Sequence, residues 1–261
     1  MATTEIKSLL HFDESATKDE SYKTVWTLGE NATLSSAQKK FGSSSLYLPT
    51  ADSFIMCENN EFFRITAPND EYKGVYEVEF FIWLDESVKE FNPVIFSGQL
   101  SNNESVALDK NYVKFYFNNI ANNMKWNLTF KGTTSGSTTL EIDPEIFSYN
   151  TWHHFLLRMS FNTELAGRED TNIVDVFIFL DGKCIYSRNK YEYIDFSTVK
   201  IGNFVGYIDE LVYRIIKVDK NATVNIYRDD PNSMTVPTSP YVYVASEADK
   251  LAYENRFKTT P

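Results

Sequence analysis

Short segments in which hydrophobic and polar residues alternate recur along most of the chain, separated by clusters of Gly, Asn, Asp and Ser. In Val75–Leu84, hydrophobic side chains occupy alternate positions from Tyr76 onward, and Glu77 and Glu79 lie between them. Successive side chains of a β-strand point to opposite faces of the sheet. The pattern therefore predicts a strand whose hydrophobic face packs on a core.

Trp152–Phe161 shows the same alternation. One face carries the alternate residues His153, Phe155, Leu157, Met159 and Phe161, and the other carries Arg158 and Ser160. We therefore expect His153 to face the core and to be hydrogen-bonded there, because an unpaired polar group is costly to bury. Further strands are predicted over Ser8–Phe12, Val25–Leu28, Ser44–Leu48, Ser53–Met56, Pro93–Ser97, Tyr112–Phe117, Lys125–Phe130 and Tyr207–Ile215. Many short strands separated by turn residues are typical of an all-β sandwich or barrel.

A hairpin is predicted in the second half of the chain. Val174–Leu180 is hydrophobic on both faces apart from Asp175, as expected of a strand inside a sheet. Asp181-Gly182 follows it, and a second strand is predicted over Lys183–Ser187. Asp-Gly between two such segments indicates a type I′ turn, which requires positive φ at both central residues.

The C-terminal residues differ from the rest of the chain. Pro237 and Pro240 interrupt a linker, and beyond them Ser246 and Asp249 have the spacing of a helix capping box, so a helix is predicted to run to about Phe257. We therefore predict one β-sandwich domain over residues 1–235, followed over residues 236–261 by a linker and a short helical appendage that is a candidate docking tail.

The charge excludes some classes of partner. The 261 residues carry a net charge of −11, with a pI of about 4.8, and aromatic residues make up 15% of them. Such a surface repels polyphosphate, so nucleic acid and anionic membranes are not expected as partners. The two cysteines, Cys57 and Cys184, have no metal-binding or redox spacing, and two unpaired thiols are expected. The first residues contain no signal-peptide pattern, and no segment is hydrophobic enough to predict a membrane span.

Six segments in a fixed order resemble landmarks of laminin-G-like, concanavalin A-like domains. They are Leu9–Asp13, Phe41–Leu48, Tyr76–Leu84, Thr151–Phe155, Val176–Tyr186 and Ile201–Leu211. The resemblance implies an all-β fold, a two-sheet antiparallel jelly-roll sandwich. The fold alone does not identify a function, because sandwich folds carry many.

The first two of these segments most resemble modules of tail, fibre or head-decoration proteins of bacterial viruses. This resemblance implies a non-enzymatic binding or structural module of a virion, made in the host cytoplasm. Its expected partners are a surface glycan or a neighbouring structural subunit, and an oligomer is one expected state. A cell-surface adhesion domain is an alternative.

Asp209 is the first candidate site residue. In a strand over Tyr207–Ile215 it shares a face with Tyr207, Leu211, Tyr213 and Ile215, and a carboxylate on a hydrophobic face needs a partner. Backbone N–H groups or a Tyr hydroxyl would suffice, and so would Ca²⁺, which takes oxygen ligands. Members of the resembled family often hold a structural calcium ion between the first strand and this late aspartate, which implies a calcium site at Asp13 and Asp209.

Glu141-Ile142-Asp143-Pro144-Glu145 resembles the catalytic strand of concanavalin-type glucanases, in which carboxylates occupy alternate positions. Retaining hydrolysis uses two carboxyl groups about 5–5.5 Å apart. Pro144 argues against a central strand here, because proline cannot donate to the sheet. We expect an acidic turn, and a glucanase using Glu141 and Glu145 is the enzymatic alternative.

Two further features bear on sugar binding. Trp83, Trp126 and Trp152 are candidates for stacking on sugar rings, although aromatic residues in strands more often belong to the core. The polar segments Gln99–Asp109 and Ala166–Asn172 are the loops expected to contribute to a sugar site, because loops on a rigid scaffold often carry binding residues.

Overall fold

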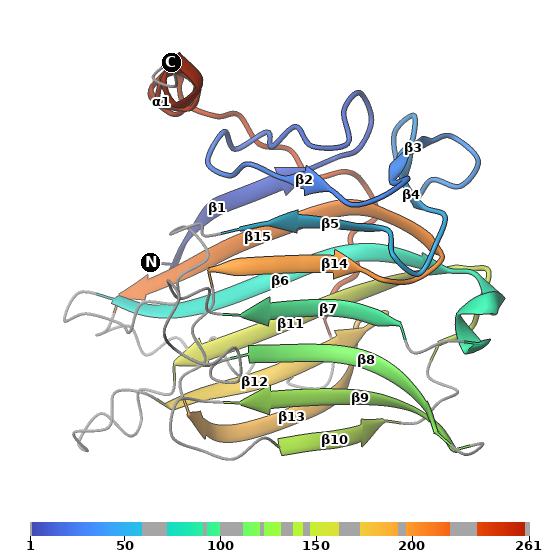
Figure 1. The fold of residues 1–261 in the computed structure, drawn as a ribbon. Helices are drawn as coiled ribbons and strands as arrows, with labels where there is room; N and C mark the ends of the chain where they lie inside the picture. The colour runs from blue at the N-terminus through green and yellow to red at the C-terminus, as the bar shows by residue number, and fades with distance from the viewer. Residues whose placement is uncertain are drawn as a thin grey trace, which may run out of the picture.

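The computed structural model describes residues 2–58, 72–90, 93–99, 112–120, 123–131, 138–142, 147–161, 173–192, 197–219 and 234–258. These residues form two β-sheets that lie face to face, with one helix near the C-terminus (Figure 1). Every strand pairing is antiparallel, as the pairings of β15 with its neighbours illustrate. The predicted all-β, two-sheet antiparallel sandwich with a C-terminal helix is therefore confirmed.

The eight-stranded sheet, here called sheet A, places β15 at its centre. Along its order the strands are β13 (Lys183–Glu192), β12 (Ile173–Leu180), β11 (Trp152–Phe161), β6 (Tyr72–Leu84), β15 (Gly206–Asp219), β4 (Ser45–Leu48) and β3 (Thr33–Ser35), and β1 (Ala2–Leu10) pairs with β15. One edge of β15 pairs along its whole length with β6. The other edge is shared between β4 and β1.

The seven-stranded sheet, sheet B, faces the viewer in Figure 1. In order, its strands are β10 (Thr138–Ile142), β9 (Asn123–Lys131), β8 (Tyr112–Ile120), β7 (Val94–Gln99), β14 (Thr198–Gly202), β5 (Phe54–Cys57) and β2 (Thr27–Leu28). A short 3₁₀ helix, η2 (Glu86–Glu90), follows β6, and α1 (Glu247–Lys258) lies outside the two layers. No helix among the described residues is long and hydrophobic enough to cross a membrane.

The core between the sheets contains the faces that the alternation predicts. All the alternate residues of β6 from Tyr76 to Leu84 are buried in it, as are Phe155, Leu157 and Met159 of β11. Aromatic rings dominate its centre, where Phe155 lies 5.0 Å from Phe80 and 5.3 Å from Phe115, centroid to centroid. Large buried rings contribute strongly to stability through their area and their mutual packing.

The local signals at the hairpin and at the helix are also confirmed. Asp181 and Gly182 have φ of 50° and 78°, the two positive values that a type I′ turn requires. The backbone N–H of Asp249 donates to Ser246 Oγ at 3.1 Å, which satisfies a donor of the first helical turn.

Three strands were not predicted: β3, β10 and β14. They are short, and β3 and β10 are rich in polar residues, so their sequences have no clear hydrophobic face. The expectation of an acidic turn at Glu141 is wrong, because Glu141 lies in β10, in register with Asn127 of β9. Asp143, Pro144 and Glu145 lie outside the described residues.

Cys57 lies buried in the core and Cys184 is half-buried. Neither of these described residues forms a disulfide.

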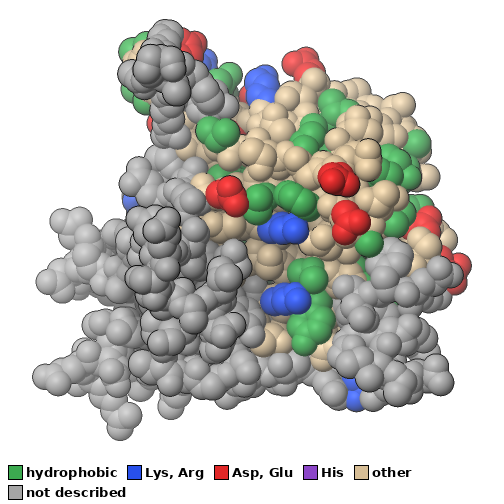
Figure 2. Space-filling view, viewed as in Figure 1, with side chains coloured by type: hydrophobic (Ala, Val, Ile, Leu, Met, Phe, Trp, Pro, Cys, Tyr) green, Lys and Arg blue, Asp and Glu red, His purple; other side chains and the backbone are tan. Residues whose placement is uncertain are grey.

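The outer face of sheet B carries basic and hydrophobic side chains at the surface (Figure 2). Lys200 lies 4.0 Å above the ring of Phe54, and Lys114 lies 4.7 Å above the ring of Tyr116. Burial lowers the pKa of both lysines.

The outer face of sheet A is different, because much of it is buried. Glu77 is fully buried there between Arg158, at 2.5 Å, and Arg214, at 2.5 Å. Glu79 is paired with Arg214 at 2.6 Å and with His154 at 2.6 Å. Burial raises the pKa of Glu79, but His154 and Arg214 outweigh it and hold that pKa below its ordinary value.

The C-terminal segment covers this charge network. The backbone N–H of Met234 donates to the carbonyl of Gly182 at 2.6 Å, and the Arg158 guanidinium donates to Met234 Sδ at 3.2 Å. Farther along, the ring of Tyr241 lies 5.7 Å from the Arg214 guanidinium. The C-terminal segment therefore contacts sheet A at Met234 and Tyr241, while the boundary between the domain and its tail stays a prediction.

Replacing Glu77 with Ala should lower the free energy of unfolding by about 3 to 5 kcal/mol, because two largely buried arginines would lose their shared carboxylate. Urea denaturation measures this change. The matched control is Glu30→Ala, at an exposed position, which should stay within about 0.5 kcal/mol of the parent. Equal effects of the two substitutions would show that the network does not stabilise the fold.

Candidate functional site

Asp209 lies on the outer face of sheet A, at a β-bulge in β15. It is in register with Phe81 of β6, and the register then shifts before Val212. Glu210 has a φ of 52°, a conformation that costs a non-glycine residue free energy. The extra residue reverses the alternation, so Leu211 and Tyr213 face the core while Asp209 faces away. The expectation that Asp209 shares a face with Leu211, Tyr213 and Ile215 is therefore wrong.

Three backbone N–H groups donate to the Asp209 carboxylate. Those of Lys40 and Phe41 lie 2.8 and 3.1 Å from Oδ2, and that of Glu210 lies 3.0 Å from Oδ1. Burial raises the pKa of Asp209 to about 7, although these N–H groups act in the opposite direction. Asp209 thus holds the first residues of the loop over residues 40–44 against the sheet.

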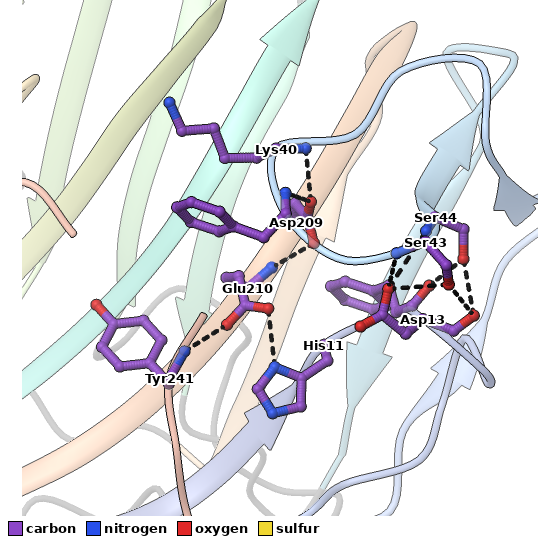
Figure 3. Close-up of polar contacts among 10 residues, drawn as sticks. His11, Asp13, Lys40, Ser43, Ser44, Asp209, Glu210 and Tyr241 are labelled. Carbon is purple, nitrogen blue, oxygen red and sulfur yellow. Dashed lines mark hydrogen bonds and ion pairs between the residues drawn. The ribbon is translucent and has the colours of Figure 1, made fainter. Parts of the chain in front are cut away.

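Asp13 holds the other end of the same loop (Figure 3). Its carboxylate accepts hydrogen bonds from the backbone N–H groups of Ser43 and Ser44. Between the two anchors, Gly42 has a φ of 56°, and a side chain there would clash with the Asp13 carboxylate. Burial raises the pKa of Asp13, but the N–H groups of Ser43 and Ser44 outweigh it, so the pKa is lowered.

Glu210 connects this region to the first strand and to the C-terminal segment (Figure 3). It accepts a hydrogen bond from His11 Nδ1 at 2.8 Å and one from the backbone N–H of Tyr241 at 3.0 Å. The hydrogen bond to Glu210 raises the pKa of His11. Beside it lies a cleft of about 250 Å³ lined by His11, Phe12, Asp13, Glu14, Ser15, Lys18 and Glu20.

The hydrogen bonds support the N–H alternative for Asp209. Calcium takes oxygen ligands, whereas the Asp209 carboxylate is bound by N–H donors, and the Asp13 carboxylate by two N–H donors and the Ser43 hydroxyl. In the part of the chain that the structure describes, no group of three or more His, Cys, Asp and Glu residues has a geometry that would hold a metal ion. No observation tests a calcium site at Asp13 and Asp209 directly, and of the two alternatives these hydrogen bonds favour the one without calcium.

The anchored loop places an aromatic ring and an ammonium group on sheet A. Phe41 contacts Phe81 edge to face, with centroids 5.3 Å apart. Lys40 Nζ lies 5.0 Å from the centroid of Phe81 and 5.8 Å from that of Phe41. Figure 3 shows the Lys40 side chain running away from Asp209 while its backbone N–H points to the carboxylate.

Next to this loop, four aromatic side chains form a row across sheet A, here called the aromatic ladder: Tyr47, Tyr207, Trp83 and Trp152. They are direct cross-strand neighbours on β4, β15, β6 and β11. Tyr47 and Tyr207 stack with centroids 4.7 Å apart, and Trp83 meets Tyr207 edge to face at 5.4 Å. All four rings are half-buried, so each keeps part of its surface in contact with solvent.

The sequence identified part of this row. Trp83 and Trp152 belong to the ladder, whereas Trp126 is fully buried and stacks on Phe115 in the core. Tyr47 and Tyr207 were not identified, because only the strand pairing brings them beside Trp83.

His153 is buried, as expected, and it has two partners. It is hydrogen-bonded to Asp181 at 2.6 Å and to the carbonyl of Ser148 at 2.7 Å. Burial lowers the pKa of His153, but these two hydrogen bonds outweigh it and raise that pKa. Its role is to join the hairpin turn to the preceding loop. Except for Gln99, the predicted sugar-binding loops Gln99–Asp109 and Ala166–Asn172 lie outside the described residues.

No protein-family model and no curated protein matches this chain. Solved structures do share its fold. The botulinum neurotoxin serotype D binding domain is 13% identical, with a TM-score of 0.51 over 96% of this chain and 51% of that one. A mutant of HCR/D is 14% identical, with the same TM-score and the same coverage. This chain spans about half the length of these structures, and at such identity the likeness establishes a shared β-sandwich fold.

Replacing Asp209 with Asn should change how stability depends on pH. Between pH 3.8 and about 7, the folded protein keeps a proton on Asp209 that the unfolded chain loses. The free energy of unfolding of the parent should therefore fall as pH rises through this window, relative to the variant, by on the order of 2 kcal/mol. Urea denaturation at several pH values measures the difference, and parallel pH profiles would contradict it.

Treatment with EDTA tests whether Asp13 and Asp209 hold a calcium ion. Because N–H groups already bind both carboxylates, EDTA should leave the melting temperature unchanged. Native mass spectrometry with and without EDTA provides the second measurement. Loss of one calcium ion together with a lower melting temperature would contradict this expectation and support a calcium site at Asp13 and Asp209.

Proposed function

We propose that this chain is a non-catalytic binding module that holds a glycan on the aromatic ladder. The single observation that carries the proposal is the row of four half-buried rings at one end of sheet A. The face of an aromatic ring is electron-rich, so it attracts the C–H groups of a sugar ring that lies on it. Neighbouring strands are about 4.8 Å apart, so the row extends over about 14 Å, which is room for more than one sugar unit.

The engagement of the buried carboxylates supports a binding role over a hydrolytic one. Glycoside hydrolysis needs a pair of carboxyl groups that face the substrate. The buried carboxylates of sheet A instead bind partners within the fold: Glu77 and Glu79 bind arginine side chains, and Asp209 and Glu210 bind backbone N–H groups. These groups stabilise the sandwich. The similar structure of botulinum neurotoxin serotype D is a binding domain, and a shared fold is compatible with that role.

We place the module on a virion, in a tail, fibre or head decoration assembled in the host cytoplasm, on the strength of the sequence resemblance. A neighbouring subunit is the second candidate partner. Val242 and Val244, which are 92% and 85% exposed, alternate with the inward-facing Tyr241 and Ala245. An extended segment with exposed valines offers hydrophobic area to another chain. A cell-surface adhesion domain would use the same ladder.

A glycan array followed by titration of the bound sugars tests the proposal. Replacing Trp83 with Ala should weaken glycan binding about tenfold or more, because aromatic anchors dominate binding energies. The matched control is Tyr116→Ala, which removes a half-buried ring from the outer face of sheet B and should leave affinity unchanged.

Two results would contradict this function. One is a parent protein that binds no sugar on the array. The other is hydrolysis of a bound glycan that is lost in Glu145→Gln, which would favour the glucanase alternative.

A further inference from the structure

Lys40 lies one row away from the aromatic ladder. Its ammonium is 5.0 Å from the centroid of Phe81, and Phe81 precedes Trp83 by two residues on the same face of β6. Residues two apart in a strand are separated by about 7 Å. A sugar ring seated on Trp83 would therefore carry its substituents to within reach of this ammonium.

Contacts of both its backbone and its side chain fix the position of Lys40. Its backbone N–H donates to Asp209 at 2.8 Å, which ties this end of the loop to β15. Its side chain lies over two rings, those of Phe81 and Phe41, which attract a cation. An ammonium held in this way loses little conformational freedom when a ligand binds to it.

The ammonium is also available for a ligand. Among the described residues, no acidic side chain forms an ion pair with Lys40, and its carboxylate neighbour Asp209 is occupied by N–H groups. This contrasts with Arg214 of the same sheet, which binds two glutamates.

Charge differs on the two sides of the ladder. Lys40 lies on the side of Phe81, whereas Asp85 follows Trp83 by two residues on the other side. Burial raises the pKa of Tyr207, and the charges of Tyr47 and then Asp85 raise it further. An acidic group on a bound sugar would be attracted on the first side and repelled on the second. The arrangement would therefore orient the ligand as well as select it.

On this basis, and resting on the proposed function, we infer that the ladder binds an acidic saccharide whose carboxylate pairs with Lys40. The protein carries a net charge of −11, which disfavours highly charged polyanions in general. A sugar with a single carboxylate next to its stacking ring matches one ammonium beside one row of rings.

The test compares pairs of glycans that differ only in their acid group, such as sialyllactose with lactose and oligogalacturonate with its methyl ester. Titrations use the parent, Lys40→Gln, Lys40→Arg and Lys39→Gln. Lys39 is the matched control, because it is the adjacent lysine of the same loop and is exposed. The parent should bind the acidic member of a pair about tenfold tighter, and added salt should reduce that preference.

Lys40→Gln should reduce the preference to within about twofold without changing the affinity for the neutral member, because only a charged hydrogen bond is lost. Lys40→Arg should retain the preference, and Lys39→Gln should match the parent. A parent that binds acidic and neutral members equally would overturn this inference and leave glycan binding on the ladder intact. Equal weakening of binding to both glycans of a pair in Lys40→Gln would also overturn it, since that result would show that Lys40 acts by packing the loop and not by pairing with a carboxylate.

Failure of the proposed function gives a different result. In that case no member of any pair binds, or Trp83→Ala binds every glycan as the parent does. The inference about Lys40 would then fall with the function on which it rests.

Discussion

The β-bulge at Asp209 and Glu210 determines which side chains lie on the outer face of sheet A. Without the extra residue, the carboxylate of Asp209 would share a face with Leu211 and Tyr213 and would enter the core. The bulge turns it outward, where three N–H groups bind it. The bulge puts Glu210 in a strained conformation with positive φ, which costs free energy. The hydrogen bonds of the Glu210 side chain to His11 and Tyr241 offset this strain.

The outer face of sheet A consists of three regions along the direction of its strands. Farthest from the ladder, the network of Glu77, Arg158 and Arg214 lies under the C-terminal segment. In the middle, the anchored loop over residues 40–44 covers Phe81. At the end, the aromatic ladder keeps part of its surface open to solvent. Among the described residues of this sheet face, the ladder is a row of four adjacent aromatic rings that are each partly exposed to solvent.

The ladder differs from a loop-built binding site in its rigidity. Its four residues are in paired strands of one sheet, so their spacing is set by backbone hydrogen bonds. Sites on such elements are held more closely in position than sites on loops. The Lys40 ammonium is the one part of the proposed site that a loop supplies, and Asp209 and Asp13 restrict that loop at both ends.

Local patterns in the chain were sufficient to predict the buried face of Val75–Leu84, the turn at Asp181-Gly182 and the helix start at Ser246, because each depends on residues that are close in sequence. The same patterns predicted an all-β sandwich or barrel, and the resemblance of six ordered segments to a known family narrowed this prediction to a two-sheet sandwich. The remaining features depend on how strands that are far apart in the sequence pair with one another. The bulge that turns Asp209 outward and the register that places Tyr47 beside Tyr207 join segments far apart in the chain. The burial of Glu77 between two arginines from other strands is of the same kind. Alternation shows which way a side chain points along one strand, but only the pairing of strands shows which side chains it meets.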